Sequence, residues 1–146
     1  MKTRNDLIAR KLARQKWGEV QRQEKYGEGI WWFDCCAHGG YIIDTDVYKF
    51  LKDFNEFVYC RRNGRYGYTE EQHFAAFEED CDFNIINYVL FDEVGKKLYK
   101  YRKNEEQSFE IFKEQILNEA AENIRRWYPE KAECYLSLKE KNKAII

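Results

Sequence analysis

The chain has 146 residues, of which 44% are hydrophobic, so it is long and apolar enough for one folded domain and is not a disordered chain. Its formal net charge of −1 argues against a general nucleic-acid binder and against a strongly acidic mimic of DNA. The sequence has neither an apolar run of roughly 18 residues nor a signal peptide, so we expect a cytoplasmic protein that does not enter a membrane. In that compartment the five cysteines are expected as thiols or metal ligands.

Charged residues are distributed unevenly along the sequence. Residues 1–17 carry one acidic side chain, Asp6, and residues 70–82 carry acidic side chains without a Lys or Arg. This bipolar distribution suits protein–protein docking, and it equally describes two solvated helix faces. The basic residues of the first stretch are Lys2, Arg4, Arg10, Lys11, Arg14 and Lys16.

Five elements are predicted before residue 70. In chain order they are a helix over 4–25, a strand over 29–36, a return strand over 41–43 after a loop at 37–40, a short helix over 46–54, and a hairpin with strands over 57–61 and 65–69. Helical spacing of apolar residues indicates the first helix, and the aromatic run indicates the first strand. The pair Asn63-Gly64 is the strongest turn signal, with Arg61, Arg62 and Arg65 gathered around it.

Four further elements are predicted after residue 70. They are a helix over 70–91, an edge strand over 94–102, a helix over 105–127 that Pro129 ends, and a strand over 133–138. The first of these helices begins at a capping box, Thr69 to Gln72. Together the elements predict an α+β fold in a single domain over 1–146, with a small antiparallel sheet of hairpins packed by three to four helices and frayed ends at 1–3 and 140–146.

Two short stretches concentrate the side chains that can do chemistry. Two thiols and an imidazole stand beside two glycines in CCAHGG (35–40), and four carboxylates surround a thiol in EEDCD (78–82). Paired glycines permit unusual backbone conformations and a close approach of other groups. We therefore expect a site where these two stretches meet.

Zinc is the cofactor that these side chains suggest, because it takes thiolate and imidazole donors from two separate elements. The expected ligands are Cys36, His38, His73 and Cys81. His73 is the weakest of the four, since it would lie about 12 Å from Cys81 along the axis of one helix.

Other ligand sets remain open for the same site. Glu78, Glu79, Asp80 or Cys35 could replace His73 or Cys36, because zinc accepts mixed sets that include carboxylates. Without a metal, the cysteines would be small buried apolar residues, and His38 would hydrogen-bond a carboxylate of 78–82. Both interpretations place His38 close to residues 78–82.

Catalysis has thinner support, and no catalytic residue is assigned. Cys36 lies only two residues before His38, which is a poor position for a nucleophile and its base. Cys81 with His38, or a zinc-bound water with Glu79 as base, would be needed for a hydrolase. The sequence contains no glycine-rich phosphate loop and no H-E-x-x-H or G-x-S-x-G motif.

The two stretches resemble an uncharacterised domain family of phages, plasmids and bacterial mobile elements. The pattern of that family is a G-H-G-G turn after a strand and E-E-D-C-D-W at a helix, matched here by AHGG (37–40) and EEDCDF (78–83). Ala37 and Phe83 depart from the pattern, and Cys36 and His73 are not part of it. The match covers roughly residues 30–90. Because the family has no agreed activity, the resemblance implies a setting more than a mechanism.

The chain also resembles phage anti-CRISPR proteins that bind metal and block Cas9. That resemblance implies a non-enzymatic inhibitor that binds a host CRISPR effector nuclease in the host cytoplasm, with a structural zinc joining the hairpin loop to the acidic helix. Aromatic residues, 17% of the chain, would supply interface anchors. The alternatives are a zinc- or cysteine-dependent hydrolase and a nucleic-acid-binding accessory protein that uses the basic N-terminal helix. The sequence specifies neither the interface nor the oligomeric state.

Overall fold

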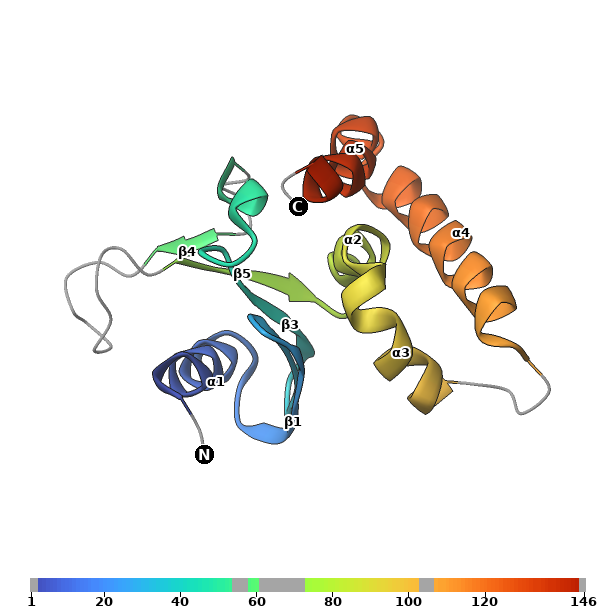
Figure 1. The fold of residues 1–146 in the computed structure, drawn as a ribbon. Helices are drawn as coiled ribbons and strands as arrows, with labels where there is room; N and C mark the ends of the chain where they lie inside the picture. The colour runs from blue at the N-terminus through green and yellow to red at the C-terminus, as the bar shows by residue number, and fades with distance from the viewer. Residues whose placement is uncertain (1–2, 54–57, 61–72, 103–106, 145–146) are drawn as a thin grey trace. The chain divides into compact units, whose positions relative to one another are not determined.

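A computed structural model describes residues 3–53, 58–60, 73–102 and 107–144. It contains an antiparallel sheet and several helices (Figure 1), which confirms the predicted α+β class. The chain divides into two compact units, Met1–Glu79 and Asp80–Ile146. That the whole chain forms a single domain stays a prediction. No helix among the described residues is long and apolar enough to cross a membrane.

The first unit holds the sheet. Its elements are α1 (Arg4–Trp17), β1 (Val20–Gly27), β2 (Ile30–Cys35), β3 (Gly39–Asp44), the 3-10 helix η1 (Lys49–Asp53), β4 (Val58–Cys60) and β5 (His73–Glu78). The five strands are antiparallel, in the order β1-β2-β3-β5-β4. β5 is therefore an interior strand, and it lies directly beside β3.

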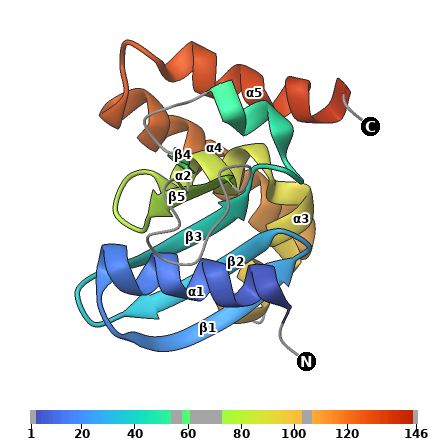
Figure 2. The ribbon, with the colours of Figure 1, turned by 90° about the vertical axis from the view of Figure 1, so that its left-hand side faces the viewer.

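Helix α1 covers one face of this sheet, as Figure 2 shows. Side chains from α1, β2, β3 and β5 form a shared hydrophobic core between the helix and the strands. Each large apolar side chain buried there contributes roughly 1.5–3 kcal/mol to stability, so packing dominates the docking of α1. The core residues are Ile8, Ala9, Leu12, Ala13, Trp17, Trp31, Phe33, Ile42, Phe74 and Ala76.

Asp6 is the polar anchor at the start of α1. Its carboxylate accepts hydrogen bonds from the indole N–H of Trp31 at 2.8 Å and from the backbone N–H of Thr3 at 2.7 Å, and it pairs with Lys25 Nζ at 3.3 Å. Thr3 completes a capping box with Asp6, which satisfies backbone N–H groups at the helix start. Burial raises the pKa of Asp6, but the hydrogen bonds from Thr3, Trp31 and Lys25 outweigh it and lower the pKa to about 2.

The second unit is helical. Its elements are α2 (Phe83–Val89), α3 (Phe91–Arg102), α4 (Phe109–Trp127) and α5 (Ala132–Ala144). α2 packs against α3, α4 and α5, and α4 also contacts α3 and α5. Aromatic rings join these helices: Tyr99 packs against Phe109 and Phe112, and Tyr128 stacks edge-on against Tyr135.

The helix predicted over 4–25 is too long, because α1 ends at Trp17. Gly18 follows with φ of 92°, a left-handed conformation that suits glycine and ends helices. Residues 20–27 pair with β2 as strand β1. Pairing with the aromatic strand β2 therefore decides the conformation of residues 20–27, although their apolar residues have a helical spacing.

The helix predicted over 70–91 is wrong for residues 73–78, which form β5. Phe74, Ala75, Ala76 and Phe77 are all buried, although side chains along a strand alternate between its two faces. A strand that is buried on both faces has a continuous run of apolar residues and lacks the alternation that indicates a strand. The sequence pattern of residues 73–78 therefore suggests a helix where the structure has a strand. The chain becomes helical only at α2.

The two strands predicted near the C-terminus are helices. Residues 94–102 belong to α3, and residues 133–138 belong to α5. In α3, Val94 and Leu98 are buried four residues apart, and in α5 Tyr135 and Leu138 are buried three residues apart. These spacings place the buried side chains on one helix face, and packing of that face decides the structure over local alternation.

The strands predicted over 29–36 and 41–43 and the helix over 105–127 are confirmed as β2, β3 and α4. The short helix predicted over 46–54 is the shorter 3-10 helix η1. β4 lies within the predicted strand 57–61 and pairs with β5. Within the described residues, Thr3 caps α1 and α5 extends to residue 144, and fraying of the two ends stays a prediction. Outside the described residues lie the predicted strand 65–69, the turn 63–64, the arginines at 61, 62 and 65, and the capping box 69–72.

Asp6→Asn tests the polar anchor of α1. Because the pKa of Asp6 is depressed in the folded state, its carboxylate stabilises the fold above about pH 4, and this stabilisation is lost as pH falls towards about 2. We expect Asp6→Asn to lower the free energy of unfolding by roughly 1–2 kcal/mol at pH 7, with the difference disappearing near pH 2. Urea denaturation at several pH values measures this.

Glu28→Gln is the matched control for this test. Glu28 pairs with the same lysine, Lys25, but its side chain is 84% exposed, so its removal should change stability by less than roughly 0.5 kcal/mol. A difference between Asp6→Asn and the unsubstituted chain that is constant from pH 7 to pH 2 would contradict the assigned role of the carboxylate.

Candidate functional site

The two motif stretches meet at one end of β3, between β2 and β5. Gly40 lies opposite Glu78 in the β3–β5 ladder, and the backbone N–H of Glu79 donates to the carbonyl oxygen of Gly39 at 2.9 Å. On the other side, Gly39 lies opposite Asp34 of β2. We call residues 36–40 with Glu78 and Glu79 the β3 corner. The expected meeting of residues 35–40 with 78–82 is confirmed for this set.

Glycine is required at the β3 corner because neighbouring backbones approach closely. A Cβ on Gly39 would lie 2.5 Å from the carbonyl oxygen of Phe33, and a Cβ on Gly40 would collide with the carbonyl oxygen of Phe77. Both glycines belong to β3, so the predicted loop at 37–40 is corrected to a turn at 36–38. The paired glycines therefore let three strands come together beside His38.

The turn at 36–38 is fastened to the end of α1. The carbonyl oxygen of Trp17 accepts hydrogen bonds from the backbone N–H groups of Ala37 at 3.1 Å and His38 at 3.4 Å. The N–H of Cys36 donates to Glu19 at 3.0 Å. These hydrogen bonds hold the backbone of His38 in place, so the position from which its imidazole extends is fixed.

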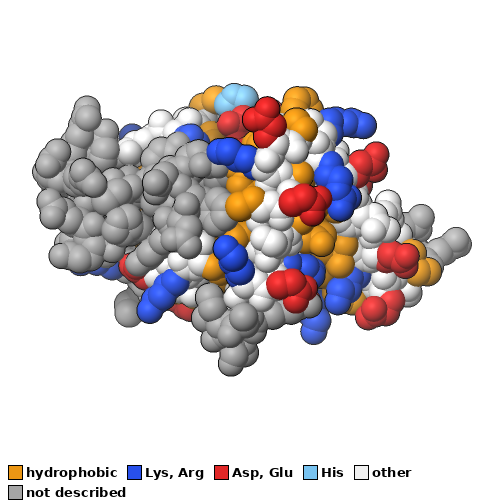
Figure 3. All heavy atoms as spheres, turned by 90° about the horizontal axis from the view of Figure 1, so that it is seen from above, with side chains coloured by type: hydrophobic (Ala, Val, Ile, Leu, Met, Phe, Trp, Pro, Cys, Tyr) orange, Lys and Arg blue, Asp and Glu red, His pale blue; other side chains and the backbone are white. Residues whose placement is uncertain are grey.

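His38 and Glu78 form the polar pair of the β3 corner. His38 Nδ1 lies 3.1 Å from Glu78 Oε1, and the two side chains are 49% and 33% exposed. Acidic side chains lie beside the pale blue histidine in Figure 3. Nδ1 donates a hydrogen bond to the carboxylate when it carries a proton, and without that proton Nδ1 and the carboxylate oxygen lie close enough to bind one metal ion.

The two cysteines before the turn differ in environment. The Cys35 thiol is half-buried against the α1 core, with its sulfur 4.0 Å from the carbonyl oxygen of Ala13. Burial raises the pKa of Cys35 to about 11, so this thiol stays protonated at neutral pH and is a poor nucleophile. Cys36 is exposed and packs beside Gly18, where a Cβ would come within 2.6 Å of its sulfur.

The four expected zinc ligands are not all brought together. His73 starts β5 and pairs with Cys60, whereas Glu78 ends β5 at the β3 corner. The two residues are five positions apart along an extended strand, which is roughly 17 Å, so the structure does not bring His73 to the β3 corner. Cys81 lies beyond the first unit, as does the alternative ligand Asp80. Within the first unit, the structure brings His38 and Glu78 together.

Sequence reasoning missed the part that α1 plays in the corner. Trp17 and Gly18 were placed inside a continuous helix, so their contacts with the turn had no basis in the pattern. Gly18 was the available signal, since a glycine after basic residues near a helix end is typical of a helix C-terminus.

The sequence matches a protein family described as Domain of unknown function (DUF7007) over residues 10–144. The chain belongs to this family. Membership of an uncharacterised domain family agrees with the resemblance that the two motifs carry. No curated protein and no solved structure matches the chain.

Gly40→Ala tests whether close strand contact defines the corner. An added Cβ must displace the carbonyl of Phe77, so we expect a loss of roughly 2 kcal/mol or more in the free energy of unfolding. Gly27→Ala is the control, because a Cβ there meets only Ile30 Cδ1 at 3.9 Å and should change stability by less than roughly 0.5 kcal/mol. Equal effects of the two substitutions in chemical denaturation would contradict this account.

Proposed function

We propose that this chain is a small phage-type anti-defence protein, which inhibits a host CRISPR effector nuclease such as Cas9 by binding a surface of it without turnover. The observation that carries the proposal is the exposed His38–Glu78 pair held on a fixed backbone. A rigid, half-exposed polar pair suits recognition by a partner, since little side-chain freedom is lost on binding. The resemblance of the two motifs to a mobile-element family, and of the chain to phage anti-CRISPR proteins, supplies the setting.

The outer face of α1 supports the same proposal. Arg4, Lys11 and Arg14 are exposed on this face, and none of them forms an ion pair with another described residue. The helix carries one acidic residue, Asp6. Its carboxylate accepts a hydrogen bond from Trp31 and forms an ion pair with Lys25, both on the sheet. The positive face is therefore uncompensated within α1, and it suits an acidic surface on a partner protein.

We also propose a structural zinc at the β3 corner. His38 and Glu78 supply two neighbouring donors, and Cys36 is an exposed thiol in the same turn. An imidazole nitrogen and a carboxylate oxygen are both donors that zinc accepts.

Metal analysis of untagged protein tests the zinc proposal. We expect about one equivalent of zinc, and we expect both His38→Ala and Glu78→Gln to lower it to less than about a fifth of that value. His73→Ala is the matched control, because His73 starts β5 far from the corner and should leave the zinc content unchanged. Less than about a tenth of an equivalent in protein never exposed to chelator would contradict the proposal.

Inhibition of purified Cas9 loaded with guide RNA tests the main proposal. DNA cleavage should stop at about one equivalent of inhibitor and should not stop at far lower ratios, because a binding inhibitor does not turn over. The triple variant R4E/K11E/R14E should slow association with Cas9 by at least about tenfold at low salt, with a smaller change in the dissociation rate.

The matched control is R125E/R126E/K141E, which reverses three exposed charges of the second unit. It should bind Cas9 as the unsubstituted chain does. Inhibition at about a hundredth of an equivalent would instead indicate the hydrolase alternative. Tight binding of free DNA that weakens steeply with salt would indicate the nucleic-acid-binding alternative.

A further inference from the structure

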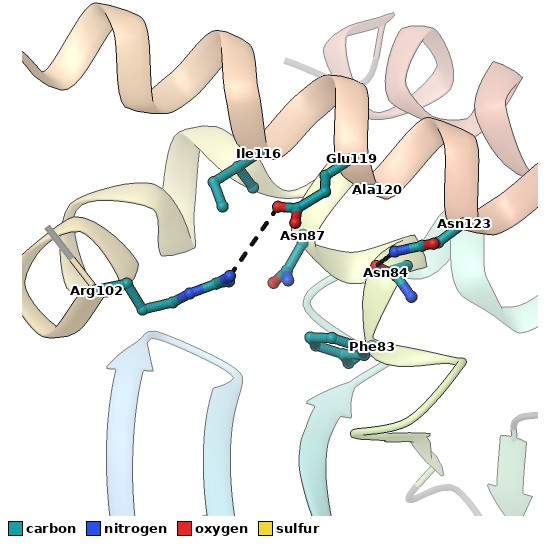
Figure 4. Close-up of a pocket in the computed structure, with 8 residues that line it drawn as sticks. All are labelled: Phe83, Asn84, Asn87, Arg102, Ile116, Glu119, Ala120 and Asn123. Carbon is teal, nitrogen blue, oxygen red and sulfur yellow. Dashed lines mark hydrogen bonds and ion pairs between the residues drawn. The ribbon is translucent and has the colours of Figure 1, made fainter. Parts of the chain in front are cut away.

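The second unit contains a small pocket between α2, α3 and α4, drawn in Figure 4. Its volume is about 60 Å³. No residue of the β3 corner lines it, so it is independent of the function proposed above. Its lining residues are Phe83, Asn84, Asn87, Arg102, Ile116, Glu119, Ala120 and Asn123.

Three asparagines give the pocket its chemistry. Asn84 and Asn87 on α2 are only 4% and 3% exposed, and Asn123 reaches in from α4. Asn84 Nδ2 donates to the carbonyl oxygen of Cys81 at 3.0 Å, and Asn84 Oδ1 accepts from Asn123 Nδ2 at 3.4 Å. These bonds fix the orientation of Asn84. Each side-chain amide has two N–H groups and an oxygen with two lone pairs, so it can make several hydrogen bonds at once.

The remaining walls of the pocket are apolar or electrically balanced. The ring of Phe83 stands on one side, and Ile116 and Ala120 of α4 contribute aliphatic surface (Figure 4). Arg102 and Glu119 lie on another side with their charged groups 4.0 Å apart, and both are about half exposed. Because their charges offset each other, the pocket favours a neutral polar group over an ion.

We propose that this pocket binds a carboxamide group, from either a free small amide or a glutamine or asparagine side chain of a peptide. A carboxamide both donates and accepts hydrogen bonds, which matches the amide groups that face the pocket. Its flat face suits the ring of Phe83, and its few heavy atoms suit the volume.

Proton–nitrogen NMR of the full ¹⁵N-labelled chain tests this proposal through the side-chain amide signals of Asn84, Asn87 and Asn123. Propionamide should shift these signals saturably, with a Kd on the order of millimolar for a ligand of five heavy atoms. Propionate, which has the same shape but a negative charge, should bind at least about fivefold more weakly. Ala120→Leu should abolish the shifts by filling the pocket, whereas Ala121→Leu, one residue further along α4 and outside the lining, should not.

Each remaining outcome decides for or against the proposal. Shifts that do not saturate, equal binding of propionate, or an unchanged response in Ala120→Leu would overturn it. If Ala120→Leu does not fold, Asn123→Leu serves instead, and it too should abolish the response. The peptide acetyl-Gly-Gln-Gly-amide, compared with its Glu counterpart, separates the two sources. Tighter binding of the Gln peptide than of propionamide supports a peptide side chain, and equal binding supports a free amide.

Discussion

The close contact of β3 with β2 and β5 at Gly39 and Gly40 determines where the β3 corner lies. Two consecutive glycines allow both neighbouring strands to approach the β3 backbone closely. The hydrogen bond from the backbone N–H of Glu79 to the carbonyl oxygen of Gly39 continues this contact past the end of β5. As a result, residues that are forty positions apart in the sequence become neighbours. The imidazole of His38 and the carboxylate of Glu78 meet at the place where these strands converge.

Hydrophobic packing and a few polar contacts together position α1 on the sheet next to the β3 corner. The α1 core provides most of the stabilisation, while the polar contacts select the register in which α1 sits on the sheet. Asp6 holds the start of the helix to Trp31 and Lys25, and the carbonyl of Trp17 holds its end to the turn that carries His38.

The sequence was informative where local chemistry decides structure. It predicted the α+β class, the aromatic strand β2, its return strand β3 and the long helix α4, and it predicted that His38 lies near the carboxylates that follow Phe77. It failed where long-range pairing overrides local pattern. β5 is buried on both faces and so lacks the alternation of a half-exposed strand, and β1 depends on pairing with β2 for its conformation. The misassigned β5 also explains why His73 was grouped with Cys81, since that grouping assumed one helix.

The hydrogen bonds from the turn to Trp17 have a thermodynamic consequence for binding. They connect the end of α1, whose outer face is basic, to the turn that carries the imidazole of His38. A partner that contacts both surfaces meets groups whose relative positions are already set, so the conformational entropy lost on association is small. For a partner of the proposed kind, the binding energies at the two surfaces would then add nearly in full.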